Sequence, residues 1–166
     1  MAEENFGSRE IIKVGIVVDD IEKAAEYYQK IFQFDSVPSV RLPDPNKKPE
    51  PGTYRLLRGQ KTDPKLKCCI IPLGPVYLEV IEPCSGQPSP WLEFLEKNGP
   101  GVCFLSFYVN GLENTLDFMR ENGAPAFFVE EKGFERYAYF ETQKLLGVTL
   151  EAKEQDRLPS RGEEQG

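Results

Sequence analysis

Two stretches of this chain repeat each other without a gap. Residues 13–25 align with residues 104–116 at a constant offset of 91, so that Val14 matches Leu105 and Ile16 matches Phe107. Both stretches begin with a run of apolar residues typical of a strand, pass through an acidic or amide turn, and continue with helical spacing. Each is followed by three more strand-like runs. The repeat therefore predicts an α+β fold built from two tandem βαβββ modules.

The repeat divides the chain into five predicted parts. They are a flexible N-terminus (1–10), a first module (11–83), a linker helix (84–100), a second module (101–154) and a disordered tail (155–166). The first module is expected to hold a helix at 21–34 and strands at 11–18, 53–58, 66–73 and 76–81. The second is expected to hold a helix at 112–122 and strands at 102–109, 126–130, 137–140 and 148–152. Residues 37–52 are rich in proline and are predicted to form a loop.

Alternation along the strands separates the residues that pack on the helices from those that face away. On the faces turned away from the helices, alternation places Lys13, Glu79, Phe104 and Glu151. We expect the two modules to form a cup-shaped, curved mixed sheet whose concave side these residues line, a good place for a small-molecule site. The alternative is that the three charges lie on a solvated sheet face, as antiparallel sheets often have.

The net charge of the chain excludes some classes of binding partner. It carries 27 acidic and 20 basic residues and a net charge of −7, and such a surface repels nucleic acid and anionic lipid. No apolar stretch is long enough to cross a bilayer, and the polar N-terminus does not resemble a signal peptide. We therefore expect a small-molecule substrate or ligand as the partner, without nucleic acid or membrane, and a homodimer, which is common among small proteins.

Histidine is absent from all 166 residues. This excludes serine–histidine and cysteine–histidine nucleophilic chemistry and any histidine-ligated metal. The four cysteines, Cys68, Cys69, Cys84 and Cys103, contain no CxxC pair. They are predicted to be reduced thiols in or near strands, which indicates the cytoplasm. Proton transfer in this chain has to come from carboxylates, lysine, tyrosine or cysteine.

Several motifs resemble the vicinal oxygen chelate superfamily, which includes glyoxalase I, extradiol dioxygenases, bleomycin-resistance proteins and methylmalonyl-CoA epimerase. They are KVGIVVDDIEKAAEYY from residue 13, LEVIEP from residue 78, SPWLEFLEKNGPGVCFLSF from residue 89 and GVTLEA from residue 147. The likeness covers about residues 11–153, and it is greatest to the epimerase branch. It implies metal-ligand positions at Lys13, Glu79, Phe104 and Glu151. At these positions the family has histidine, then often glutamate, glutamine or histidine, then histidine and glutamate.

Two of these four ligand positions are therefore replaced. We hypothesise that Lys13 bridges Glu79 and Glu151 and substitutes for the charge of the metal, since two facing carboxylates would otherwise repel each other. No cofactor is expected, although two carboxylates and waters could hold a divalent cation weakly. The resemblance implies an epimerase, isomerase or lyase acting next to a carbonyl, with Lys13, Glu79 and Glu151 as the catalytic residues. Strict methylmalonyl-CoA epimerase activity is not expected, because the metal site is not intact.

Two other readings stay open at this point. One is a non-catalytic binding protein of the bleomycin-resistance type, with an acidic, aromatic-lined cup suited to a planar or cationic ligand. The other is a subunit or regulatory module in which the Lys13–glutamate pair is only structural. The residues predicted to bind a substrate or ligand are Tyr54, Tyr77, Phe104, Ser106, Tyr108 and Tyr139. Each aromatic among them could instead pack in the core.

Overall fold

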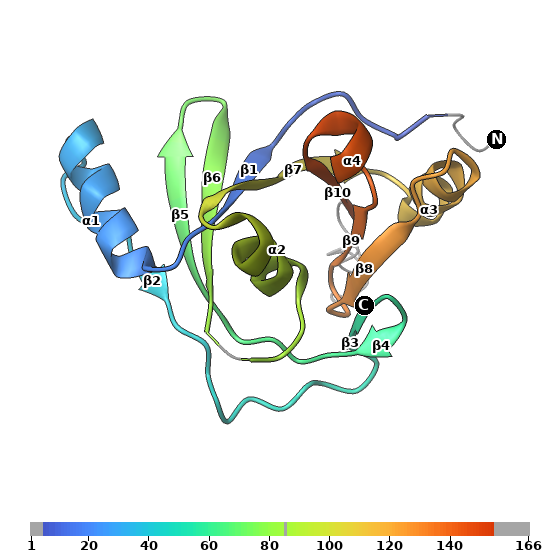
Figure 1. The fold of residues 1–166 in the computed structure, drawn as a ribbon, viewed down its shortest axis with the longest axis horizontal. Coiled ribbons are helices and arrows are strands. Elements are labelled where there is room, and N and C mark those ends of the chain that lie inside the picture. Colours follow the sequence, from blue (N-terminus) through green and yellow to red (C-terminus); the bar gives the residue numbers. More distant parts are fainter. Residues whose placement is uncertain (1–4, 85, 155–166) are drawn as a thin grey trace, which may run out of the picture. The chain divides into compact units, whose positions relative to one another are not determined.

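The computed structural model describes residues 5–84 and 86–154, and these residues form two compact units (Figure 1). The first unit contains residues 11–48 and 62–106. The second unit contains residues 5–10, 49–61 and 107–154. Each unit is therefore assembled from segments that are separated along the chain.

In the first unit, five strands follow the hydrogen-bonded order β2-β5-β6-β1-β7. The strands are β1 (Lys13–Val17), β2 (Val40–Arg41), β5 (Leu66–Leu73), β6 (Val76–Pro83) and β7 (Gly101–Val109), whose last three residues belong to the second unit. β1 runs parallel to β6 and antiparallel to β7, so this part of the sheet is mixed. Two helices accompany these strands, α1 (Ile21–Phe32) and α2 (Pro90–Asn98).

The helix α1 begins where the sequence supplies a capping side chain. The Asp20 carboxylate accepts a hydrogen bond from the backbone N–H of Lys23, which satisfies one of the free donors of the first turn. The apolar face of α1 buries Ile21 and Ala25 against Cys69, Ile71 and Val80 of β5 and β6, and Figure 1 shows the helix beside these strands. The opposite sheet face is left for polar groups.

In the second unit, five strands follow the order β10-β9-β8-β3-β4. They are β3 (Tyr54–Leu57), β4 (Gln60–Lys61), β8 (Ala126–Glu131), β9 (Arg136–Phe140) and β10 (Thr149–Glu154). The helices are α3 (Leu112–Glu121) and the single turn α4 (Gln143–Leu146). Leu112 and Met119 of α3 pack with Ala138, Phe140 and Ala152 of the sheet, which forms the core of this unit.

These elements confirm the α+β class, with a βαβββ order in β1-α1-β2-β5-β6 and again in β7-α3-β8-β9-β10. Two details differ from the prediction. The strand expected at 53–58 in the first module, β3, pairs with β8 in the second unit (Figure 1). The short β2, within the segment expected as a loop, pairs with β5 instead. The prolines around β2 limit it to two residues, because proline donates no hydrogen bond to a ladder.

The repeat also extends to the ends of the modules. The segment LEVIE at residues 78–82 corresponds to LEAKE at 150–154. Glu82 accepts a hydrogen bond from the first backbone N–H of α1 at 3.0 Å, and Glu154 accepts one from the first N–H of α3 at 3.2 Å. Each carboxylate thus caps the helix of its own unit, where the helix dipole favours a negative charge.

Of the segment expected as a flexible N-terminus, the structure describes residues 5–10, while residues 1–4 and the expected tail at 155–166 lie outside the described residues. Phe6 packs edge-on against the rings of Phe107 at 5.3 Å and Phe140 at 5.7 Å, measured between centroids. The carbonyl of Phe6 accepts a hydrogen bond from the buried Thr115 hydroxyl at 2.8 Å. An isolated apolar residue in a polar segment becomes part of the core in this way.

No helix in the described part of the chain is long and apolar enough to span a membrane.

The packing of Phe6 yields a stability prediction. Phe6→Ala should lower the free energy of unfolding by about 2 kcal/mol, less than for a fully buried phenylalanine, because Phe6 is only partly buried. The matched control is Phe134→Ala, whose ring is 55% exposed in the same unit and should change stability by less than about 0.5 kcal/mol. Urea unfolding followed by circular dichroism measures both. Equal effects of the two substitutions would contradict the role assigned to Phe6.

Candidate functional site

The sheet face of the first unit that points away from α1 is defined by strand register. Lys13 lies between Tyr77 of β6 and Ser106 of β7, and in the next row Gly15 lies between Glu79 and Phe104. Directly paired residues point to the same side of a sheet, with Cβ atoms about 4.5–5.5 Å apart. These six residues are therefore immediate neighbours, and they include every first-unit residue that the sequence predicted for the site.

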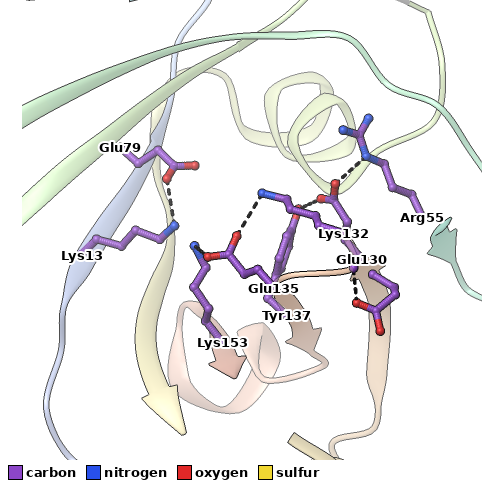
Figure 2. A network of polar contacts seen from close by, with 10 residues as sticks. Lys13, Arg55, Glu79, Glu130, Lys132, Glu135, Tyr137 and Lys153 are labelled. Atoms are coloured by element: carbon purple, nitrogen blue, oxygen red, sulfur yellow. Dashed lines mark hydrogen bonds and ion pairs between the residues drawn. The ribbon is translucent and has the colours of Figure 1, made fainter. Parts of the chain in front are cut away.

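Lys13 and Glu79 form a buried ion pair. The Lys13 Nζ donates to Glu79 Oε2 at 2.8 Å, and the Lys13 side chain is 4% exposed while that of Glu79 is 21% exposed (Figure 2). Withdrawing an ammonium from water costs several kcal/mol, which a well-placed carboxylate offsets. One half of the predicted Lys13 bridge is thus observed, with the glutamate as the partner that water can still reach.

The ring of Phe104 covers the place where Gly15 lacks a side chain. A Cβ atom built on Gly15 would lie 2.0 Å from Phe104 Cε1, far inside contact distance. Phe104 is completely buried, and Lys13 Nζ lies 5.7 Å from the centroid of its ring, within the range of a cation–π interaction. The aromatic residue at this position therefore forms the floor of the site beside the ammonium.

A thiol and a guanidinium lie on the same face. Cys68 pairs with Arg41 of β2 on one side and with Ile81 of β6 on the other. Burial and the Glu79 carboxylate raise the pKa of the Cys68 thiol, while Arg41 and Lys13 lower it, and the net result is a raised pKa. The thiol is therefore a neutral neighbour of the charged groups.

The second unit holds its own polar row across four strands. Register pairs Arg55 of β3 with Glu130 of β8, Glu130 with Tyr137 of β9, and Tyr137 with Lys153 of β10. The Arg55 Nε donates to Glu130 Oε1 at 2.8 Å, and the Tyr137 hydroxyl donates a short hydrogen bond to Glu130 Oε2 (Figure 2). Both oxygens of this buried carboxylate therefore have partners.

Two lysines flank the ring of Tyr137. Lys132 Nζ lies 5.4 Å and Lys153 Nζ 5.9 Å from its centroid, and both ammonium groups bind Glu135, at 3.2 and 3.3 Å. Burial raises the pKa of Glu135, but Lys153 and Lys132 outweigh it and lower the net pKa. Burial raises the pKa of Tyr137 well above its ordinary value, as do the Glu130 and Glu151 carboxylates, so its hydroxyl stays protonated.

Four of the predicted site residues lie in the second unit. Glu151 is 1% exposed on β10 and is paired by register with Tyr139. Tyr139 is equally buried, with its ring centroid 5.7 Å from that of Phe128 and 5.6 Å from that of Tyr137. Tyr54 and Tyr108 are 38% and 37% exposed. Tyr139 thus packs as a core residue, whereas Tyr54 and Tyr108 present part of their rings to solvent.

The Arg55–Glu130–Tyr137 row was missed by the sequence analysis. Residues two apart on a strand point to the same face of the sheet. Alternation would therefore have placed Glu130 with Phe128 on β8, and Tyr137 with Tyr139 on β9. Arg55 could not have been found in this way, because nothing local to β3 indicates that its partner is β8.

The first-unit residues do not make a ligand set for a divalent cation. Phe104 has no donor atom, the Lys13 ammonium has no lone pair, and Glu79 Oε2 already accepts from that ammonium. Among the described residues, the carboxylates of Asp20, Glu22 and Glu82 do lie close enough together to share an ion. Glu22 and Glu82 bind Lys67 there, at 3.0 and 3.5 Å, so this cluster already has a cation.

The chain belongs to the glyoxalase/bleomycin resistance protein/dioxygenase superfamily, whose model matches residues 13–140. This confirms the resemblance carried by the strand and helix motifs. A search of curated proteins finds no match.

Solved structures of the same fold include three instructive neighbours. A hypothetical protein of Bacillus halodurans C-125 is 19% identical, with 92% of this chain and 98% of that chain covered and a TM-score of 0.57. Methylmalonyl-CoA epimerase of Mycobacterium tuberculosis is 19% identical, with coverages of 94% and 91% and a TM-score of 0.56. The Streptomyces coelicolor epimerase in complex with 2-nitronate-propionyl-CoA is 19% identical, with coverages of 90% and 98% and a TM-score of 0.59. At this identity the likeness establishes a shared fold.

The contact between Gly15 and Phe104 yields a second prediction. Gly15→Ala should destabilise the protein by about 1–3 kcal/mol, because a completely buried ring has to move to admit the methyl group. The double variant Gly15→Ala/Phe104→Leu should lose less than the sum of the single losses, since leucine vacates part of that space. Denaturant unfolding of the four proteins of the cycle measures this coupling.

Gly101→Ala is the matched control for that cycle. Gly101 lies on β7 in the same unit, and its added Cβ would meet Phe94 at an ordinary 3.7 Å. It should leave stability unchanged or raise it slightly, because alanine loses less backbone entropy on folding. Strictly additive losses in the Gly15/Phe104 cycle would show that the ring does not limit the residue at position 15.

Proposed function

We propose that this protein is a small-molecule enzyme that carries out epimerisation, isomerisation or lyase chemistry next to a carbonyl group. The observation that carries the proposal is the buried pair of Lys13 and Glu79, a cation and an acid in contact on the sheet face turned away from α1. The catalytic set is Lys13, Glu79 and Glu151, the last of which is a separate buried acid on β10.

Lys13 has the role of stabilising negative charge on the substrate oxygen. Removing a proton beside a carbonyl produces an enolate, and a fixed ammonium in a water-poor site favours that charge more strongly than it would in water. The Lys13 side chain is 4% exposed, and its ammonium lies beside the ring of Phe104. Packing fixes the position of this ammonium, whereas a lysine on the surface would be mobile. Little reorganisation therefore accompanies the reaction.

A carboxylate has the role of moving the proton. Glu79 is suited to it because its side chain remains 21% exposed and its Oε2 lies 2.8 Å from the ammonium. An enolate oxygen that binds Lys13 competes with Glu79 for the same ammonium, so both groups act on one bound substrate. Glu151 is the second candidate for this transfer, and substitution separates the two roles.

Chemistry without a divalent cation is part of the proposal, supported by the Lys13 and Phe104 replacements. Purified protein should contain only substoichiometric metal by plasma mass spectrometry, and its activity should survive EDTA. Stoichiometric metal that disappears in Glu79→Ala would contradict this part of the proposal.

A binding protein of the bleomycin-resistance type is the second candidate. It is favoured by the partial exposure of Tyr54 and Tyr108, which leaves aromatic surface available to a planar or cationic ligand. In such a protein the Lys13–Glu79 pair would orient a ligand without turnover. Four free thiols support a reducing compartment such as the cytoplasm, and the homodimer expected from chain size stays a prediction.

The enzyme proposal predicts exchange of a carbon-bound proton with solvent. In D2O, at least one member of a panel of 2-oxo acids, 3-oxo esters and acyl thioesters should gain deuterium beside its carbonyl, as followed by NMR. Lys13→Met should slow this exchange by about 100-fold or more, because the oxyanion loses its cation. Glu79→Gln and Glu151→Gln should show which acid transfers the proton, by a similar loss.

Lys23→Met and Glu113→Gln are the matched controls, since both side chains are mostly exposed and belong to surface ion pairs. They should leave exchange unchanged. A protein that binds members of the panel but exchanges none of them would favour the binding candidate over the enzyme.

A further inference from the structure

Ser106 is a completely buried residue whose hydroxyl has no hydrogen-bond partner among residues 5–84 and 86–154. Leaving a buried hydroxyl unsatisfied destabilises a fold, and buried polar groups are usually paired for that reason. Thr115, a comparably buried hydroxyl in the second unit, follows that rule by donating to the carbonyl of Phe6. Ser106 therefore departs from the pattern of the same chain.

The position of Ser106 relates the hydroxyl to the ammonium of Lys13. The two residues are paired directly across β7 and β1, and the Ile12 N–H donates to the Ser106 carbonyl at 2.9 Å. Their side chains leave the sheet on the same side, in the row adjacent to Glu79, Gly15 and Phe104. A buried hydroxyl and a buried ammonium thus start from neighbouring points of one face.

The strands of the first unit do not carry the acidic excess of the whole protein on this face. Along the paired strands β2, β5, β6, β1 and β7, the ionisable charges on this side are Lys13, Arg41 and Glu79, which leave one net positive charge. The chain as a whole carries −7. These strands therefore lack the excess negative charge of the whole chain, which lowers the repulsion that an anionic ligand meets at Lys13.

We propose that the Lys13 ammonium and the Ser106 hydroxyl together bind one oxygen of a small monoanionic oxoacid. Lys13 supplies the charge, and Ser106 supplies a second, directional O–H donor to the same oxygen. The inference rests on the proposed function and extends it, because it restricts the substrate from any carbonyl compound to one that carries a negative charge on oxygen. The unsatisfied hydroxyl of the ligand-free protein is explained as a donor reserved for that ligand.

Oxamate and oxamide test the charge requirement, because they have nearly the same shape but carry charges of −1 and 0. By isothermal titration calorimetry, oxamate should bind the wild-type protein at least about 10-fold more tightly than oxamide. Ser106→Ala should weaken oxamate binding by about 10-fold or more, as expected for loss of a hydrogen bond to a charged group. Lys13→Met should weaken it further.

Thermal unfolding separates a ligand-binding role of Ser106 from a structural one. Ser106→Ala should leave the Tm of the ligand-free protein unchanged or raise it by about 2–4 °C, because it removes a buried unsatisfied donor. Thr115→Val is the matched control: it should lower the Tm, since it leaves the Phe6 carbonyl without its donor, and should leave oxamate binding unchanged.

Three results would overturn the inference. They are the absence of oxamate binding to the wild-type protein, equal binding of oxamate and oxamide, and a Ser106→Ala variant that has a lower Tm but binds oxamate normally. The proposed function would be overturned by different results. Oxamate binding that depends on Ser106, without any deuterium exchange, would support the oxoacid site and reject the enzyme. Exchange that needs Lys13 but not Ser106 would support the enzyme and reject the oxoacid site.

Discussion

The absence of a side chain at Gly15 is the constraint on which the candidate site depends. Since position 15 has no Cβ, the ring of Phe104 can lie flat against the backbone of the neighbouring strand. The ring fills the centre of the sheet face, and the Lys13 ammonium rests beside it while it reaches Glu79 on the other side of β1. A glycine, an aromatic residue and an ion pair therefore act together, and a change in one alters the space open to the others.

This arrangement explains how an ammonium can be kept in a place that repels charge. Burial alone disfavours a charged group, and the Glu79 carboxylate 2.8 Å away stabilises the ammonium. The low exposure of the Lys13 side chain strengthens its electrostatic interaction with Glu79. The second unit also keeps a charged group buried, because the Glu130 carboxylate is held between the Arg55 guanidinium and the Tyr137 hydroxyl. Both units thus keep charge on the face turned away from their helix.

The sequence was sufficient to predict the features that depend on local period and on the repeat. Alternation placed Lys13 and Glu79 on one face, and the offset between residues 13 and 104 identified the two central strands. In the structure those two strands pair antiparallel, with Lys13 opposite Ser106 and Gly15 opposite Phe104. The contact of Phe104 with Gly15 could not be predicted, because it depends on a side-chain rotamer and on the register of strands far apart in the chain. The partner of β3 could not be predicted for a similar reason, since a strand of four residues carries little information about which strand it pairs with.

The pairing of β3 with β8 has a consequence for the growing chain on the ribosome. Arg55 and its partner Glu130 are separated by 75 residues, so β3 leaves the ribosome long before its neighbour exists. A β-strand without a partner exposes unpaired backbone donors and acceptors. The two arginines and the lysine at 55, 58 and 61, together with the prolines just before them, disfavour pairing with other strands during that interval. The composition of this segment thus protects an unfinished molecule, besides forming the edge of a finished one.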